Sequence, residues 1–426
     1  MPEPLTRTAC EARDAADALA PLREQFDLPA GLIYLDGNSL GPLPRATAER
    51  IRRVVTGEWG NGLIRSWNSA GWIDLPHRVG DKIATLIGAR DNEVVAVDST
   101  SLNLYKVLSV ALSLTATDAP RRKVILSERD NFPTDLYIAE SLARQHGFTL
   151  RLADGDDILS QCDDDVAVLL LTQVNYRTGR MHDMTVVTTA AHQCGTLVVW
   201  DLSHSAGAVP IDLTASDADF AIGCGYKYLN GGPGSPAFVW AHPRHLARMD
   251  AERRWQPLSG WLGHAAPFDF ATSYRPAHGI ARFVSGTPSP ITLAALECGI
   301  DTVLAAGPLG GMTALRTKSL ELTALFITLI EQRCASQGFD LQTPRQPDRR
   351  GSQVSLLRHE GAYAIVQALI ARGVIGDYRD PAILRFGFTP LYLRFVDVWD
   401  AVDHLSLVLE RDEWREPRFN RRAAVT

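Results

Sequence analysis

Six short apolar runs, rich in β-branched residues, recur through the middle of the chain and constrain its fold most strongly. They are VVAVDST (94 to 100), KVILSE (123 to 128), VAVLLLT (166 to 172), LVVWDLS (197 to 203), FAIGCG (220 to 225) and AFVWAH (237 to 242). Segments of helical periodicity separate them. Strands that are apolar on both faces and alternate with helices form mostly parallel sheets covered by helices on both sides. The sequence therefore predicts a large α/β domain.

Helix signals are clearest after Phe132, where Pro133 suits a first turn and Gly147 suits a stop, and the strand-like FTLRLA follows directly. After about residue 290 the pattern changes to longer helical periods and a few short strands. We predict an N-terminal segment (1–45) that packs on both domains, a large α/β domain (46–292) and a small α+β domain (293–426).

Composition and charge favour small-molecule partners. The chain has 426 residues, a net charge of −6 and a pI near 6.0, which gives no electrostatic reason to bind nucleic acid or an anionic membrane. The first twenty residues lack a basic segment followed by an apolar one. No apolar run approaches the roughly 20 residues that a membrane helix needs. We expect a cytoplasmic protein.

Several common site motifs are missing from the sequence. The six cysteines show no CxxC pair and no histidine at zinc-finger spacing, so we expect structural thiols and no metal. There is no GxGxxG and no GxxxxGK[ST], which removes the main support for a dinucleotide or nucleoside triphosphate site. The hydroxyl-rich turn DSTSLN (98 to 103) can bind a phosphate at a helix N-terminus, or it is an ordinary helix cap.

Lys227 stands out because lysine is scarce in this chain. Only five of the 43 basic residues are lysines, and this one lies in GCGYKYLNGGPG (223 to 234), between two tyrosines and among glycines. Burial lowers the pKa of an amine, and a neutral amine forms Schiff bases with carbonyl groups. The alternative is a surface lysine whose stem lies along the protein.

Asp201 is the matching acid. It ends the apolar run LVVWD, 26 residues before Lys227, at the strand end where α/β sheets bind ligands. Pyridoxal phosphate needs a carboxylate at its pyridine nitrogen and a lysine at its aldehyde, and these two residues supply both. A helix cap is the alternative for Asp201. His204, three residues further on, is expected to be a hydrogen-bond partner in the same network.

At this point the sequence resembles the kynureninases, which are fold type I pyridoxal phosphate enzymes. The resemblance runs through most of the chain. It rests on YLDGNSLGPLP (34 to 44), STSLN (99 to 103), NFPTD (131 to 135), WDLSHSAGAVPIDL (200 to 213), GCGYKYLNGGPGSPAF (223 to 238), GWLGH (260 to 264) and RFGFTPLY (385 to 392).

The resemblance implies a role for each matching residue. Lys227 would bind the cofactor covalently, Asp201 would meet the pyridine nitrogen with support from Asp135, and Phe132 would stack on the ring. The residues implied to border the ring are His204 and Thr172; those implied to hold the phosphate are Thr100, Ser101, Tyr226, Trp261 and Thr287, the last two from the second subunit of a homodimer. Arg385 would bind the substrate α-carboxylate, and Asn38 and Ser39 would line the substrate side.

The implied reaction is hydrolytic cleavage of the Cβ–Cγ bond of L-kynurenine to anthranilate and L-alanine, in tryptophan catabolism. Animal members of the family have SNPP where this sequence has SGTP (285 to 288). Bacterial members are similar to this sequence here and favour kynurenine over 3-hydroxykynurenine, so the resemblance implies the same preference. Tyr226 is either a general acid and base or only a phosphate donor, and the sequence leaves both possibilities open.

Two other functions fit parts of the pattern. A cysteine desulfurase or selenocysteine lyase shares the expected fold, but it needs a nucleophilic cysteine on a late loop, and Cys298 and Cys334 fall inside helical patterns. A non-catalytic pyridoxal phosphate binder, such as the sensory half of a transcription regulator, would carry a DNA-binding module. The residues before YLDGNSLG are too few and too acidic for one.

Overall fold

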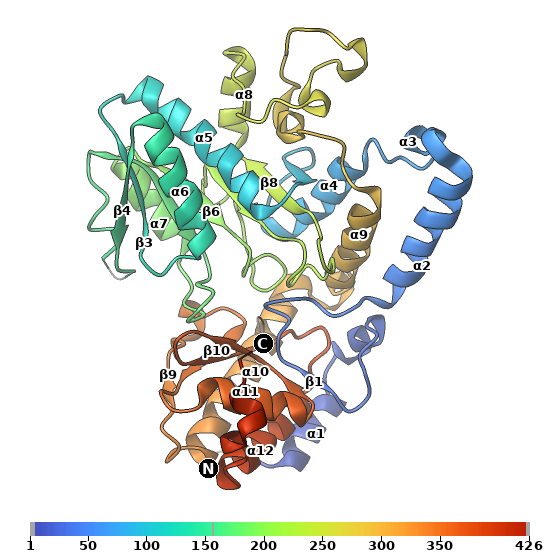
Figure 1. Ribbon diagram of the computed structural model, residues 1–426, viewed down its shortest axis with the longest axis vertical. Helices are drawn as coiled ribbons and strands as arrows, with labels where there is room; N and C mark the ends of the chain where they lie inside the picture. The colour runs from blue at the N-terminus through green and yellow to red at the C-terminus, as the bar shows by residue number, and fades with distance from the viewer. Residues whose placement is uncertain (1–4, 156, 423–426) are drawn as a thin grey trace.

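A seven-stranded sheet forms the centre of the larger, upper part of the molecule (Figure 1). The computed structural model describes residues 5–155 and 157–422. The strand order is β2-β8-β7-β6-β5-β3-β4, and β8 alone among these seven runs antiparallel to its neighbours. The strands are β2 (Val94–Val97), β3 (Val124–Glu128), β4 (Thr149–Ala153), β5 (Val166–Thr172), β6 (Leu197–Asp201), β7 (Phe220–Gly223) and β8 (Ala237–Ala241).

All six apolar runs form strands of this sheet, and the predicted α/β class with a mostly parallel sheet is confirmed. Successive residues of β2 show why both faces are apolar. Val94 and Ala96 join one buried cluster, whereas Val95 and Val97 join another on the opposite face. The FTLRLA segment forms the edge strand β4, parallel to β3.

Helices cover both faces of the sheet. They are α4 (Leu75–Ile87), α5 (Thr100–Asp118), α6 (Pro133–His146), α7 (Met184–Gln193), α8 (Pro243–Ala251) and α9 (Pro290–Leu304), with α2 (Arg45–Arg53) and α3 (Ser66–Ser69) beside them. The helix predicted after Phe132 is α6. Pro133 occupies its first turn, and Gly147 ends it with a left-handed φ of 69°.

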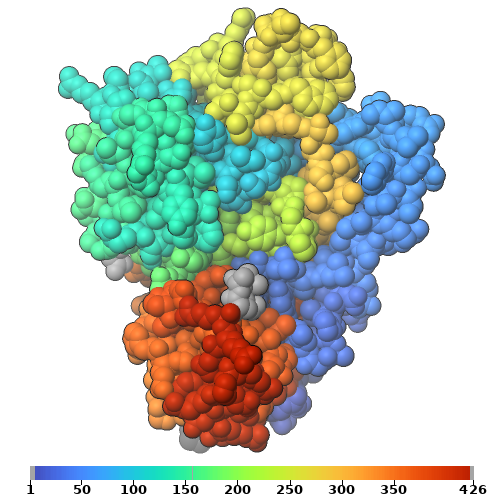
Figure 2. All heavy atoms as spheres, in the orientation of Figure 1, coloured from blue at the N-terminus to red at the C-terminus, as the bar shows by residue number. Residues whose placement is uncertain are grey.

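The lower part of the molecule is built by the C-terminal third of the chain (Figures 1 and 2). An antiparallel sheet in the order β12-β13-β10-β9 packs there with three helices. The elements are α10 (Gly311–Arg333), β9 (Asp340–Leu341), β10 (Gln353–Leu357), α11 (Ala362–Ala371), β11 (Val374–Ile375), β12 (Asp377–Arg379), β13 (Ile383–Gly387) and α12 (Phe395–Glu410).

The N-terminal segment contacts both parts. Helix α1 (Arg7–Ala15) packs on α12, and strand β1 (Ile33–Tyr34) pairs in parallel with β11 in the lower part. Helix α2 then packs on α9 beside the large sheet (Figure 1). The division of the chain at residues 45 and 292 stays a prediction.

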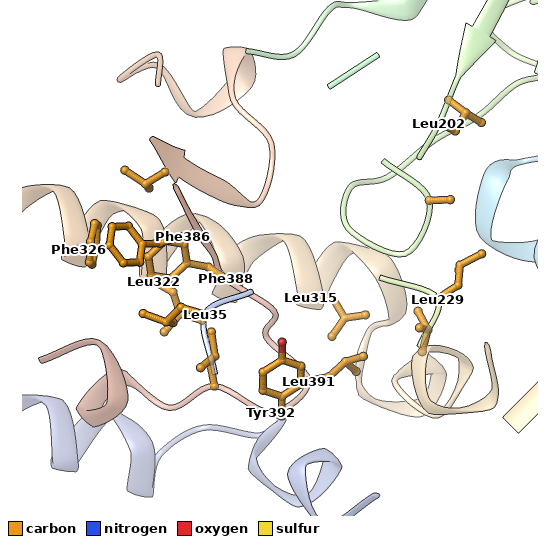
Figure 3. Packing of buried hydrophobic residues seen from close by; sticks show 14 of the residues in the cluster. Leu35, Leu202, Leu229, Leu315, Leu322, Phe326, Phe386, Phe388, Leu391 and Tyr392 are labelled. Carbon is orange, nitrogen blue, oxygen red and sulfur yellow. The ribbon is translucent and has the colours of Figure 1, made fainter. Parts of the chain in front are cut away.

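One continuous apolar core joins the two parts. Leu202 and Leu229, which follow β6 and β7, belong to the same buried cluster as Leu315 on α10 and Phe386 on β13 (Figure 3). This shared core fixes the C-terminal sheet against the loops that leave the large sheet. Residues from both parts can therefore be held at fixed positions around one site.

One expectation about apolar segments was wrong. The stretch Pro290–Leu309, which contains α9, is long and apolar enough to cross a membrane by length and composition. Half of the window is buried inside the protein, where α9 packs on α2 and α4. A core helix passes the same test, and the buried residues Leu293, Leu296 and Ile300 give this helix that character.

Asp219 is the centre of a buried electrostatic network that joins β6 to α7 and α8. Its carboxylate accepts hydrogen bonds from the Val198 amide at 2.8 Å, His192 Nε2 at 2.8 Å, His245 Nε2 at 2.7 Å and Arg244 Nη2 at 2.5 Å. Burial alone would raise the pKa of Asp219, but these hydrogen bonds outweigh burial and lower it. The hydrogen bond to Asp219 also raises the pKa of His192.

Replacing Asp219 with Asn should lower the free energy of unfolding by about 1–3 kcal/mol, because the buried carboxylate that accepts these hydrogen bonds is lost, whereas Arg244 keeps its ion pair with Asp217. The contribution of protonated His192 is fully present below its unfolded pKa of about 6.5 and is lost as the pH rises through its higher folded pKa. The loss should therefore be larger at pH 6 than at pH 9 in urea unfolding. Asp164→Asn, at an exposed ion pair with Arg122, is the control and should change little.

Candidate active site

A cavity of about 180 Å³ lies where β5 and β6 end, where β7 leaves the sheet and where α5 and α6 begin. Nine of the residues predicted from the sequence line it together: Thr100, Ser101, Phe132, Asp135, Thr172, Asp201, His204, Tyr226 and Lys227. The carboxyl ends of neighbouring parallel strands meet at one edge of a sheet, and this explains how residues so far apart in sequence converge.

Lys227 lies in the bend that follows β7. Its amine is 2.9 Å from His204 Nε2 and lies over the rings of Phe132 and Tyr226, at 5.8 and 5.7 Å from their centroids. Burial lowers the pKa of this amine and outweighs the charge of Asp201, which raises it; the charges of Arg385 and Arg379 lower it further. The amine is therefore biased toward the neutral, nucleophilic form.

The other lysines show how unusual this setting is. Lys82, Lys106 and Lys318 each pair with a carboxylate, and the exposed Lys123 lies over the ring of Phe148. Within residues 5–155 and 157–422, Lys227 forms no ion pair; the nearest polar group to its amine is an imidazole.

His204 is neutral in this site. Burial and the neighbouring charge of Lys227 lower its pKa well below the usual value. Its Nε2 meets the Lys227 amine, and its Nδ1 is buried without a hydrogen-bond partner in the described part of the chain. A neutral imidazole beside the amine adds no second positive charge.

Asp201 and Asp135 form a buried pair of acids in the wall of the same cavity. Asp201 Oδ1 accepts from the Ser203 amide at 2.8 Å and the Ser203 hydroxyl at 2.6 Å. Burial raises the pKa of Asp201, and burial with the charge of Asp201 raises that of Asp135 still more. Asp135 therefore holds a proton and donates it toward Asp201, which keeps the negative charge.

Thr172 and Phe132 are positioned by a residue that sequence analysis did not assign. Asn131 accepts from the Thr172 hydroxyl and from the Phe132 amide, the latter at 2.6 Å, and donates to Ser127 Oγ at 3.1 Å. These bonds fix the turn between β3 and α6, from which the Phe132 ring enters the cavity.

The N-terminus of α5 forms the other end of the cavity. Ser99 caps this 19-residue helix by accepting from the Leu102 amide at 3.4 Å, which confirms the helix cap. Thr100 and Ser101 line the cavity, and their binding of a phosphate stays a prediction. Unpaired amides and hydroxyls at a helix N-terminus suit a phosphate. Burial raises the pKa of Tyr226, so its phenol stays protonated and can donate there as well.

The GNSLG segment packs directly on the Lys227 bend. The Gly41 amide donates to the Tyr226 carbonyl at 2.7 Å, and a Cβ added at Gly41 would lie 2.5 Å from the Lys227 carbonyl oxygen. Only glycine allows this close approach. Asn38, earlier in the segment, is buried with both side-chain polar atoms unpaired within the described residues, and Ser39 lies against the C-terminal sheet.

Arg385 lies behind the cavity and not on its wall. Its guanidinium donates to both oxygens of Asp377, to Ser39 Oγ at 2.7 Å and to the carbonyl of Tyr176, a residue of the cavity wall, at 2.6 Å. In this structure the bidentate partner of Arg385 is therefore Asp377. The antiparallel register of β12 and β13 places these two residues directly opposite each other.

Trp261 and Thr287 do not line the cavity of this chain. They contact each other instead, with Trp261 Nε1 donating to Thr287 Oγ1 at 3.3 Å, and both are exposed on the same chain. Their predicted role required a second subunit, and it stays a prediction.

Sequence analysis missed three residues of the cavity wall and two of its supports. Ser203 and Thr134 lie inside quoted motifs, WDLSH and NFPTD, so the signal was present. Tyr176 follows β5 in a loop without a motif. The support Asn131 also lies in NFPTD, whereas Asp377 lies in no quoted motif; both hold other side chains in place.

These residues fit pyridoxal phosphate. A neutral amine, a buried carboxylate and a helix N-terminus with the two hydroxyls of Thr100 and Ser101 line one cavity, and these are the groups that an aldehyde, a pyridinium and a phosphate need. The exposed ring of Phe132 and the unpaired Nδ1 of His204 are available to the ring of the cofactor. Such a sheet and such a site define the fold type I class of pyridoxal phosphate enzymes.

Comparisons with known proteins agree with this class and narrow it. The chain is 57% identical to a kynureninase from Pseudomonas fluorescens and 56% identical to one from Burkholderia mallei, each over 99% of this chain and all of the relative. Residues 315–405 match the family model "Kynureninase C-terminal domain". The chain belongs to the kynureninase family.

Solved structures show the wider fold. A cysteine desulfurase from Thermococcus onnurineus superposes with a TM-score of 0.76 at 18% identity, over 92% of this chain and 98% of that one. A cysteine desulfurase from Escherichia coli gives 0.73 at 22% identity, with the same coverage.

The two acids should respond differently to neutralisation. Asp201→Asn removes the charge that would hold a proton on the pyridine nitrogen, and turnover should fall at least about 1000-fold. Asp135→Asn resembles the protonated acid already present, and turnover should stay within about tenfold, since an amide keeps a donor toward Asp201. Steady-state turnover with cofactor content measured by absorbance tests this difference. Equal losses in both variants would contradict the assignment of the proton to Asp135.

Proposed function

We propose that the protein is a kynureninase, a pyridoxal phosphate-dependent hydrolase that cleaves the Cβ–Cγ bond of L-kynurenine to give anthranilate and L-alanine. One observation carries the proposal: the Lys227 amine is desolvated, lacks a carboxylate partner in the described structure and shares a cavity with Asp201. Membership of the kynureninase family supplies the substrate class.

The cofactor, when bound, supplies an electron sink that draws electrons from the α- and β-carbons of the substrate. Lys227 would hold the cofactor covalently, and its neutral amine could move the α-proton of the substrate. Asp201 would hold a proton at the pyridine nitrogen with its negative charge. Asp135 would keep that charge in place, and Phe132 would pack on the ring.

Tyr226 is the acid best placed for the later proton transfers. Its phenol lies beside the Lys227 amine, and its raised pKa keeps the proton available for donation. Water adds to the γ-carbonyl, the Cβ–Cγ bond breaks, and the β-carbon receives a proton before alanine leaves. A phosphate donor without a role in proton transfer is the alternative for this residue.

Arg385 and Arg379 provide the positive potential for the α-carboxylate of the substrate. Both charges lower the pKa of Lys227 and of His204, so both act on the cavity across the Tyr176 wall. Arg385 has a planar donor array suited to a carboxylate. Asn38 and Ser39 line the substrate side, where Ser39 already contacts Arg385.

Assembly and location follow the family. The site needs Trp261 and Thr287 of a second subunit to complete the phosphate end, so we propose a homodimer with active sites at the interface. We expect the enzyme in the cytoplasm and expect weaker cleavage of 3-hydroxykynurenine than of kynurenine.

Mixing the holoenzyme with L-kynurenine should release anthranilate, detected by its fluorescence, and an equal amount of L-alanine. Lys227→Ala should lower the rate by more than about 1000-fold, because the covalent link and the proton carrier are both lost. Lys123→Ala, at an exposed lysine, is the matched control and should keep full activity. Alanine without anthranilate, or sulfide released from L-cysteine at a comparable rate, would overturn the proposal.

Tyr226→Phe separates the two roles of the phenol. If Tyr226 transfers protons, kcat should fall by about 100-fold or more with the cofactor still bound. If it only binds phosphate, the cofactor Kd should rise and kcat at saturating cofactor should stay nearly unchanged. The two constants, measured by cofactor titration and by anthranilate release, decide between these roles.

A further inference from the structure

A partly buried group of charges joins the DGNSLG segment (36 to 41) to the C-terminal sheet, and we call Asp36, Ser39, Asp377, Arg379 and Arg385 the arginine–aspartate cluster. Asp377 pairs with Arg385 and, at 2.7 Å, with Arg379. The Ser39 hydroxyl lies at the centre, 2.7 Å from Asp377 Oδ2, 2.7 Å from Arg385 Nη2 and 3.3 Å from Arg379 Nη2.

Asp36 is the member of this cluster without a salt bridge among the described residues. Its Oδ1 is buried and has no hydrogen-bond partner in the described chain, and its other contact in the cluster is the Ser39 hydroxyl. The charged groups that face it are Asp377 and Arg379 of β12 and Arg385 of β13. The titratable groups on the remaining sides are the phenols Tyr34, Tyr228 and Tyr392, whose pKa values burial and the neighbouring acids raise, so that they stay neutral.

The charge of the cluster depends on Asp36. Although burial opposes ionisation of Asp377, the two arginines outweigh it and lower its pKa, so Asp377 is negative. Burial, and then the charge of Asp377, raise the pKa of Asp36 to about 7. With Asp36 protonated the cluster carries two positive charges and one negative charge. With Asp36 ionised it is neutral overall.

We propose that Asp36 is a positioning residue that sets the charge of the arginine pair: protonated, it leaves one net positive charge for the α-carboxylate of the substrate, and ionised, it cancels that charge. The inference rests on the proposed function and deepens it, because it adds a proton-binding group, Asp36, to the site for the substrate carboxylate. Asp377 orients the two arginines in either state, whereas Asp36 decides whether they can accept a further anion.

Proton and carboxylate binding are then linked. An anion bound at the arginines makes ionisation of Asp36 harder, so binding draws a proton onto Asp36 near neutral pH. Affinity for the carboxylate is highest below pH 7 and falls as the pH rises through the pKa of Asp36. The maximum velocity is a property of the substrate complex, in which the bound carboxylate keeps Asp36 protonated, so the environment of Lys227 is the same across this range and kcat does not follow the proton.

The test compares the holoenzyme with Asp36→Asn, which keeps the shape of the protonated acid. In the wild type, KM for L-kynurenine should rise by up to about 30-fold between pH 6 and pH 8.5. The reason is that pH 8.5 lies about 1.5 units above the pKa of about 7, where only about one thirtieth of Asp36 is still protonated. In Asp36→Asn that rise should be absent, and KM at pH 8.5 should fall below the wild-type value. The kcat profiles should coincide. Asp91→Asn, at an exposed aspartate, should behave as the wild type.

The substrate amine and the cofactor titrate in the same way in the wild type and in Asp36→Asn. The difference between the KM profiles of these two enzymes against pH therefore reports on Asp36. Parallel KM profiles would overturn the inference, as would an equal rise in KM for an analogue that lacks the α-carboxylate. If Asp36→Asn does not fold, calorimetry on the wild type in buffers of different ionisation enthalpy provides a second measurement. Binding of L-alanine at pH 7.5 should take up more protons than binding of its decarboxylated analogue, ethylamine, and equal uptake would overturn the inference.

Failure of the proposed function would look different. If no anthranilate is released at any pH, the cleavage assignment fails. The calorimetric comparison of L-alanine with ethylamine does not need turnover and still decides whether Asp36 takes up a proton when a carboxylate binds.

Discussion

The burial of one uncharged amine is the constraint around which the rest of the site is arranged. Removing a lysine from water favours its neutral form only if no ionised acid lies beside it. The site meets this condition with a neutral imidazole as the contact of Lys227 and with no ion pair to its amine among the described residues; burial lowers the pKa of the amine more than the charge of Asp201 raises it. Asp135 holds a proton and so adds no second negative charge, which would restore the charge of the amine.

The C-terminal part contributes to the same balance from a distance. Arg379 and Arg385 lower the pKa of Lys227, although both lie behind the wall formed by Tyr176. The shared core of Leu202, Leu229 and Leu315 holds these charges at a fixed distance from the amine. The group that would bind the substrate and the group that would attack it are therefore electrostatically coupled before any ligand arrives.

Sequence patterns predicted the buried strands and the polar residues at their ends. They missed residues whose role depends on pairing between segments that lie apart in the sequence. The apolar runs and the FTLRLA segment identified all seven strands of the large sheet. Asp201 was found because strand ends collect ligands, and Lys227 was found because lysine is scarce in the chain. Asp377 was missed because its importance comes from lying opposite Arg385 in an antiparallel register that no local pattern encodes. The length of the apolar segment around α9 was misjudged because Glu297 and Asp301 interrupt it in the sequence. In the structure these two residues lie on one face of the helix and pair with Arg78 and Lys82, while the other face packs in the core.

The same fold serves other chemistry, so the side chains at the site must distinguish the functions. The cysteine desulfurases that superpose on this chain are less than 25% identical to it and share its architecture alone. In this chain Cys298 lies within α9, and Cys334 is buried where α10 ends, with its thiol 3.7 Å from Ser406 Oγ. Burial raises the pKa of both thiols. Neither lines the cavity, so the thiolate that sulfur transfer needs is not provided there, whereas the amine and the acid pair that amino-acid cleavage needs both line it, with the arginines behind the Tyr176 wall.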